Sequence, residues 1–118
     1  MLYCKRCNRL SPGATCPGCG KGNCLRTPEA DDPVLLCIVR MNHASMIEPL
    51  LREEGLAFST ATLGNSAIFG GSTFMENYAF YVPYAAHAQA REFLEGIFAQ
   101  DEEVMRALRE AAGEAQGL

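Results

Sequence analysis

Hydrophobic and polar residues follow two different periods beyond residue 33, and the changes of period mark the predicted elements. A continuous run at residues 34–40, apolar up to residue 39, indicates a strand that is buried on both faces in the centre of a sheet. Apolar stripes at helical spacing and shorter segments rich in β-formers follow it. The predicted elements are a helix at residues 42–54, strands at 57–63 and 77–82, and helices at 84–99 and 101–112.

Several residues mark the ends of these helices. Ser45, with Glu48 three residues later, predicts a capping box, which would place Pro49 within about the first turn of the helix. Gly55 is expected to end that helix. Asp101 is the predicted N-cap of the last helix. The resulting order is β-α-β-β-α, followed by one more helix.

Four cysteines occupy the first nineteen residues in the pattern Cys4-x2-Cys7-x8-Cys16-x2-Cys19. Each C-x2-C pair directs two sulfurs at one ion, so the pattern predicts a structural Zn²⁺ site, one per chain, with all four positions filled by protein. A segment below roughly 40 residues rarely folds without a metal, disulfides or a partner. Zinc binding releases on the order of 10–16 kcal/mol, which becomes folding energy. Iron in the same site is the alternative.

The turn residues of this segment agree with the metal-site prediction. Gly20 and Asn8 each follow a C-x2-C pair, where a positive φ is often required, and both residue types tolerate it. The pattern at residues 1–27 resembles the short, rubredoxin-like zinc ribbons at the N-terminus of many bacterial proteins. A site of this kind has no open coordination position for catalysis.

The remaining cysteines and histidines carry weaker signals. Cys24 is expected to be a bystander that does not bind the metal. The alternatives are that it is a spare metal ligand or an oxidisable surface thiol. Cys37 is expected to be a small buried hydrophobe, since a nucleophile would need a base such as His43 beside it. His87 is expected at the surface of a helix. With no Ser-His-Asp, HExxH or paired-carboxylate pattern, we expect no catalytic residues and no enzymatic activity, and an enzyme of unknown reaction is the least favoured alternative.

The charge of the chain is unevenly distributed. Residues 1–28 hold five basic and no acidic residues, which is +5, and residues 29–118 hold five arginines and fourteen acidic residues, which is −9. Four thiolates on one Zn²⁺ would leave the first segment near +3, with Tyr3 alone available to stack on a base. Nucleic-acid binding is therefore disfavoured and stays the alternative function.

Composition and the longest apolar run bear on the compartment. At 118 residues, 48% hydrophobic and 20% charged, the chain has the composition of an ordered globular protein. Its longest apolar run, at residues 34–39, is far too short to span a membrane, and the first residues do not form a signal peptide. We therefore expect a cytoplasmic protein without a membrane partner, in a compartment where thiols stay reduced.

The second part of the chain resembles a known family. The motifs are VR at residues 39–40, IEPLLREEGLA at 47–57, GG at 70–71, YVP at 81–83 and AQAREFL at 88–94. They are similar to the DUF2007 family, which is described as prokaryotic signal-transducing proteins related to the PII (GlnB-like) group. The resemblance covers about residues 34–99 and implies no catalytic residues. The connection at residues 64–76 departs from the family, being longer and more hydrophobic.

Together these features predict an α+β protein. A zinc ribbon at residues 1–27 and a linker at 28–33 would precede a ferredoxin-like domain at 34–100, with both of its helices on one face of the sheet, and a C-terminal helix and tail at 101–118. The expected function is that of a zinc-binding regulatory or adaptor protein with a protein partner. A small-molecule ligand is left open, and a homodimer is expected because the sheet leaves a face or an edge uncovered.

Two features of residues 64–76 are further candidates for binding. Ile68 and Phe69 would serve a partner contact if exposed, or pack under their own loop if not. The run GGST at residues 70–73 could bind an anion through its backbone amides, but the segment lacks a P-loop lysine.

Overall fold

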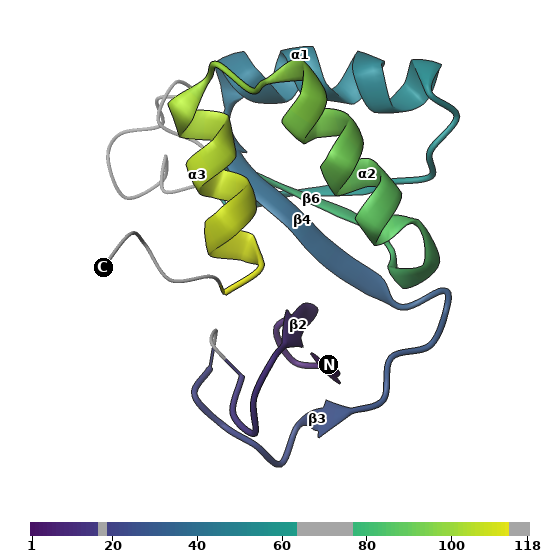
Figure 1. Ribbon diagram of the computed structural model, residues 1–118, viewed down its shortest axis with the longest axis vertical. Coiled ribbons are helices and arrows are strands. Elements are labelled where there is room, and N and C mark those ends of the chain that lie inside the picture. The colour runs from purple at the N-terminus through teal and green to yellow at the C-terminus, as the bar shows by residue number, and fades with distance from the viewer. Residues whose placement is uncertain (17–18, 64–76, 114–118) are drawn as a thin grey trace.

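A computed structural model of the chain describes residues 1–16, 19–63 and 77–113. Within them it is a mixed α+β structure with two antiparallel three-stranded sheets and three helices (Figure 1). The first sheet, in the order β2-β1-β3, consists of β1 (Leu2–Cys4), β2 (Arg9–Ser11) and β3 (Leu25–Arg26). The second, in the order β4-β6-β5, consists of β4 (Pro33–Arg40), β5 (Ser59–Leu63) and β6 (Asn77–Pro83). The helices are α1 (Met41–Glu53), α2 (Tyr84–Ile97) and α3 (Glu102–Ala111).

The position of β4 differs from the prediction. Its residues are buried on both faces as expected, but the strand lies at the edge of the sheet and β6 occupies the centre. The N-terminal sheet lies against this edge, where the Leu35 N–H donates a hydrogen bond to the Asn8 carbonyl at 2.7 Å. An apolar run therefore marks burial and does not by itself identify the central strand, because other elements can cover an edge.

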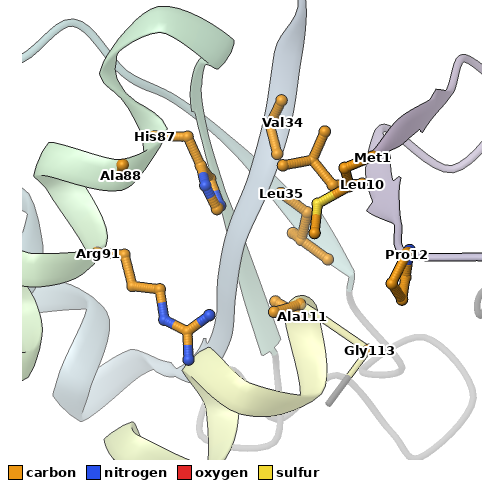
Figure 2. A pocket seen from close by; sticks show the side chains of 11 residues that line it. Met1, Leu10, Pro12, Val34, Leu35, His87, Ala88, Arg91, Ala111 and Gly113 are labelled. Atoms are coloured by element: carbon orange, nitrogen blue, oxygen red, sulfur yellow. The ribbon is translucent and has the colours of Figure 1, made fainter. Parts of the chain in front are cut away.

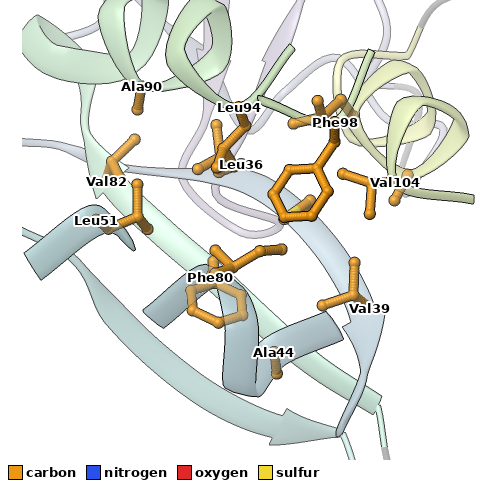
Figure 3. Close-up of a cluster of buried hydrophobic side chains, with 14 residues drawn as sticks. Leu36, Val39, Ala44, Leu51, Phe80, Val82, Ala90, Leu94, Phe98 and Val104 are labelled. Atoms are coloured by element: carbon orange, nitrogen blue, oxygen red, sulfur yellow. The ribbon is translucent and has the colours of Figure 1, made fainter. Parts of the chain in front are cut away.

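One continuous hydrophobic core holds the second sheet to its helices. Figure 3 shows Leu36 and Val39 of β4 and Phe80 of β6 among the side chains contributed by the helices. Alternate residues of β6 enter this core, as the period of two predicted. The fourteen buried members are Leu36, Cys37, Val39, Ala44, Ile47, Leu51, Phe80, Val82, Ala90, Leu94, Phe98, Val104, Ala107 and Leu108.

The last helix is part of this core. The Asp101 side chain caps α3 by accepting hydrogen bonds from the backbone N–H groups two and three residues further on, which confirms the predicted N-cap. Val104 and Leu108 pack in the main core, whereas Ala111 packs with Leu35 in a smaller cluster. Helix α3 therefore lies along β4, as Figure 1 shows, and contributes to both clusters.

The start of α1 corrects a second prediction. The helix follows β4 directly, with Arg40 as an N-cap that makes no side-chain capping bond. Ser45 lies inside the helix, where its hydroxyl donates to the Asn42 carbonyl at 2.9 Å. The capping-box prediction is therefore wrong, and Pro49 lies in the helix interior instead of the first turn. The helix itself begins one residue before the predicted start at residue 42.

The segment between the two sheets contacts the first sheet and helix α2. Arg26 donates two hydrogen bonds to the Asp32 carboxylate, at 2.7 and 2.8 Å. The Asp32 and Ala30 carbonyls accept hydrogen bonds from the N–H groups of Tyr84 and Ala85, at 2.8 and 3.0 Å. These acceptors satisfy two N–H groups in the first turn of α2, whose N-cap makes no side-chain capping bond.

Candidate metal centre

The first C-x2-C pair sits on the turn between β1 and β2. Cys4 ends β1, and its sulfur accepts a hydrogen bond from the Cys7 N–H at 3.4 Å. Asn8 has a φ of 56°, and its N–H donates to the Cys4 carbonyl at 2.8 Å. The positive φ expected after this pair is confirmed, and it lets the chain reverse so that both sulfurs face the same point.

The second pair is built in the same way. Gly20 has a φ of 71°, and its N–H donates to the Cys16 carbonyl at 2.7 Å. The Cys16 N–H in turn donates to the Lys21 carbonyl at 2.8 Å. The backbone at Gly22 lies close to Ala14, and a Cβ on Gly22 would be only 2.6 Å from the Ala14 carbonyl oxygen. This position therefore requires glycine. Two similar turns therefore present one pair of sulfurs each.

The four sulfurs come together as the spacing predicted. The Sγ atoms of Cys4, Cys7, Cys16 and Cys19 all lie within 4.8 Å of one another, and every cysteine is a free thiol. Zn–S bonds of about 2.3 Å in a tetrahedron place neighbouring sulfurs about 3.8 Å apart. The separation of the Cys4 and Cys19 sulfurs, 3.9 Å, agrees with that value. The donor set is therefore fit to hold a thiophilic metal ion through four thiolates.

The structure also brings a fifth cysteine to this cluster. Cys24, expected to be a bystander, is 8% exposed, and its sulfur lies 3.1 Å from the Cys4 sulfur and 3.6 Å from the Cys19 sulfur. The pairing of Leu25 in β3 with Cys4 in β1 positions it. A strand of two residues has no readable hydrophobic period, so the sequence pattern did not reveal this pairing.

The thiols of the cluster influence one another electrostatically. Burial raises the pKa of Cys4, but hydrogen bonds from the Cys24 thiol and the Cys7 N–H outweigh it and lower that pKa to about 6. The hydrogen bond to Cys4, followed by burial, raises the pKa of Cys24 to about 12. The cluster therefore favours a thiolate on Cys4, with Cys24 as its hydrogen-bond donor.

Cys37 and His43 do not form a nucleophile and base. Cys37 is fully buried in the core, and burial raises its pKa to about 12. The His43 Nε2 atom instead lies 2.9 Å from Asp101 Oδ2. Its Nδ1 atom lies 3.2 Å from Glu103 Oε2, without the alignment of a hydrogen bond. His43 thus joins α1 to the start of α3, and Cys37 is a buried hydrophobe as expected.

A cavity of about 530 Å³ lies between the N-terminal sheet and the α/β unit (Figure 2). Leu10 of β2, Leu35 of β4 and Ala111 of α3 contribute apolar walls, and His87 and Arg91 of α2 contribute polar groups. Burial, followed by the positive charge of Arg91, lowers the pKa of His87, which is half-buried instead of exposed as expected. The size and lining are typical of small-molecule sites.

Other candidate features contribute less to a site. Carboxylates of Glu29, Asp31 and Asp32 lie within 4.8 Å of one another, but Asp32 is already bound by Arg26. Ile68, Phe69 and the anion-binding run at residues 70–73 lie outside the described residues. Among the helices that are described, none has the length and apolar character needed to cross a membrane.

Comparison with known proteins does not assign the chain to a family or a function. No family model, curated protein or solved structure matches this chain.

Proposed function

We propose that this chain is a non-enzymatic, zinc-binding regulatory or adaptor protein. The observation that carries the proposal is the set of four cysteine sulfurs within 4.8 Å of one another. Four protein thiolates complete a tetrahedron, which is typical of structural zinc. The eight residues between the two C-x2-C pairs suit a short zinc ribbon, which favours zinc over iron.

The second sheet supports the ferredoxin-like part of the proposal. The strand β6 separates β4 from β5 and is antiparallel to both, so the first two strands of the unit are parallel and joined through α1. This arrangement is a split β-α-β unit. The N-terminal sheet packs at the outer edge of β4. A relation to PII-like signal transduction rests on the sequence motifs.

The cavity supports a ligand-sensing role. Because its walls come from both the N-terminal sheet and the α/β unit, a bound ligand would couple their relative positions. In this proposal the zinc ribbon docks on a protein partner, and the α/β unit responds to a small molecule. The structure gives little support to the alternative of nucleic-acid binding. Two of the five basic residues of the N-terminal segment already have partners within the chain, because Arg26 binds Asp32 and Arg9 donates to the Glu110 carbonyl.

A homodimer remains part of the proposal. The outer side of β5 pairs with no other described element, and its first four residues, 59–62, are exposed. An open strand edge of this kind favours pairing with another chain. Light scattering at tens of micromolar should give twice the monomer mass, and a monomer at that concentration would exclude the dimer.

Two measurements test the proposed function. Elemental analysis of natively purified protein should give one zinc per chain, and substoichiometric zinc or stoichiometric iron would contradict it. A thermal-shift screen against nucleotides and metabolites should then find a ligand that raises the melting temperature. The increase should disappear in Arg91→Gln and persist in Arg52→Gln, which removes another helical arginine that pairs with a glutamate four positions away. Electrophoretic shifts with nucleic acid at physiological salt would instead support the alternative.

A further inference from the structure

The metal centre has more sulfur donors than one ion requires. Cys24 lies beside Cys4 and Cys19, at 3.1 and 3.6 Å between sulfurs, but outside the group in which all four sulfurs are within 4.8 Å. It is therefore close to one side of the cluster only. No other described cysteine occupies such a position, because Cys37 belongs to the hydrophobic core.

We propose that Cys24 is an exchangeable fifth ligand that can replace Cys19 on the metal. A second complete donor set would then consist of Cys4, Cys7, Cys16 and Cys24. This inference rests on the proposed zinc site, and it adds a residue and a property that the four-cysteine motif does not contain.

The geometry favours exchange at Cys19. The gap of 3.6 Å between the Cys19 and Cys24 sulfurs is close to the separation of about 3.8 Å between two thiolates on one tetrahedral zinc. A change of χ1 between staggered rotamers displaces a cysteine sulfur by about 3 Å, which is comparable to the 3.6 Å between the Cys24 and Cys19 sulfurs. Cys24 is buried, whereas Cys19 is only partly buried and is the sulfur more open to exchange.

Exchange of this kind has a chemical consequence. The thiolate of Cys24 can bind the ion as that of Cys19 leaves, and the proton of the Cys24 thiol passes to Cys19 or to solvent. The ion would have four sulfur ligands before and after the exchange, and no oxidant or reductant is needed. The ribbon would therefore retain its metal when Cys19 is blocked or removed, and it could release one sulfur to an incoming acceptor.

Cobalt titration of the full-length protein tests the inference. Co²⁺ replaces Zn²⁺ in such sites, and its visible and thiolate charge-transfer absorption depends on the number of sulfur ligands. Cys19→Ser should keep the four-sulfur spectrum of the unaltered protein and bind Co²⁺ with an affinity reduced by about tenfold or less. The double variant with Cys19→Ser and Cys24→Ser should lose that spectrum and bind at least about 100-fold more weakly than Cys19→Ser.

Matched variants make the outcome specific. Cys24→Ser alone should keep the four-sulfur spectrum, because Cys4, Cys7, Cys16 and Cys19 remain, and its Co²⁺ affinity should fall by less than about tenfold. In Cys7→Ser the four-sulfur spectrum should be lost even with Cys24 present, because the contacts of Cys24 lie on the Cys4 and Cys19 side. Far-UV circular dichroism of every variant checks that the α/β unit is folded.

The possible failures are distinguishable. If the unaltered protein does not bind Co²⁺ through four sulfurs, the proposed metal site is wrong. If it does, but Cys19→Ser behaves like the double variant, Cys24 is no ligand and the metal site stands. If Cys7→Ser is rescued as well as Cys19→Ser, the exchange is not confined to Cys19 and the inference is wrong.

Discussion

The N-terminal sheet and the α/β unit differ in what holds them together. In the first, the buried side chains are mainly the clustered cysteines, together with Tyr3 and Leu10. In the second, fourteen buried residues form a continuous core of strands and helices. A segment of about 27 residues rarely buries enough apolar surface to offset its conformational entropy. Under the proposed function a metal ion would take the place of a core there, and the chain would have two sources of stability.

The two regions nevertheless share an interface. Tyr3 and Leu10 form one cluster with Val34 of β4, and the Tyr3 hydroxyl donates to the Pro33 carbonyl at 2.7 Å. The Leu35 N–H uses the Asn8 carbonyl as its acceptor. The turn that carries Cys7 and Asn8 thus contacts the edge of the second sheet directly and helps to cover it.

The largest expected effect comes from removing one ligand of the metal. Cys16→Ser should reduce zinc affinity by at least about 100-fold, because one of four thiolates is lost from a site whose binding energy folds the segment. Cys37→Ser is the matched comparison, since it places a hydroxyl in the core and leaves the sulfur cluster intact. Cys16→Ser should lower the zinc stoichiometry, whereas Cys37→Ser should lower the melting temperature of the α/β unit and leave the zinc stoichiometry unchanged. If each variant changed both quantities alike, the two regions would not be held together separately.

A large effect is also expected from the core of the α/β unit. Leu108→Ala should destabilise the protein by about 2–5 kcal/mol, because Leu108 is 1% exposed and its loss leaves a cavity. The measurement is chemical denaturation at fixed zinc, with zinc stoichiometry as the control. A cost below about 1 kcal/mol would show that α3 is an appendage and not part of the core.

A smaller effect should come from the turn of the second cysteine pair. Gly22→Ala would place a Cβ 2.6 Å from the Ala14 carbonyl oxygen and should cost the zinc-loaded segment about 1–3 kcal/mol. Gly13→Ala is the control, since no atom lies within 4 Å of a Cβ there. Zinc competition with a chromogenic chelator measures both. Equal affinities would indicate that the turn adapts without cost.

The smallest effect is expected at the start of α3. Asp101→Ala should cost about 1 kcal/mol through loss of the N-cap. Burial raises the pKa of Asp101, but hydrogen bonds from the Val104 N–H and from His43 outweigh it and hold that pKa below its ordinary value. The charge therefore stabilises the folded state above the ordinary pKa of an aspartate, and this contribution disappears as pH falls through the folded-state value.

Thermal unfolding at several pH values would measure this contribution. The difference between the unaltered protein and Asp101→Ala should be full near pH 7 and should shrink below about pH 4. A difference that grows on acidification would contradict the assigned sign.

Much of this structure could be predicted from local patterns. The positive φ of Asn8 and Gly20, the cap at Asp101 and the convergence of the four sulfurs depend on residue type and short spacing. Features that depend on long-range pairing were missed. The edge position of β4 follows from the pairing of β6 with both β4 and β5, and the approach of Cys24 follows from the pairing of β3 with β1.

The helix start at Met41 shows a different limit. Ser45 and Glu48 have the spacing of a capping box, but tertiary structure continues the strand straight into the helix and leaves Ser45 inside it. The same override explains His87, whose position on a helix predicts exposure, whereas in the structure it faces the cavity beside the N-terminal sheet and is only partly exposed. Local propensity fixes neither outcome.

Amide hydrogen exchange of the full-length, zinc-loaded protein, before and after chelation, tests the central claim most directly. If metal holds the N-terminal sheet and an apolar core holds the rest, chelation should remove protection from β1, β2 and β3. Protection in β6, α1, α2 and α3 should persist. Unchanged protection in the N-terminal strands, or its simultaneous loss throughout the chain, would contradict the account.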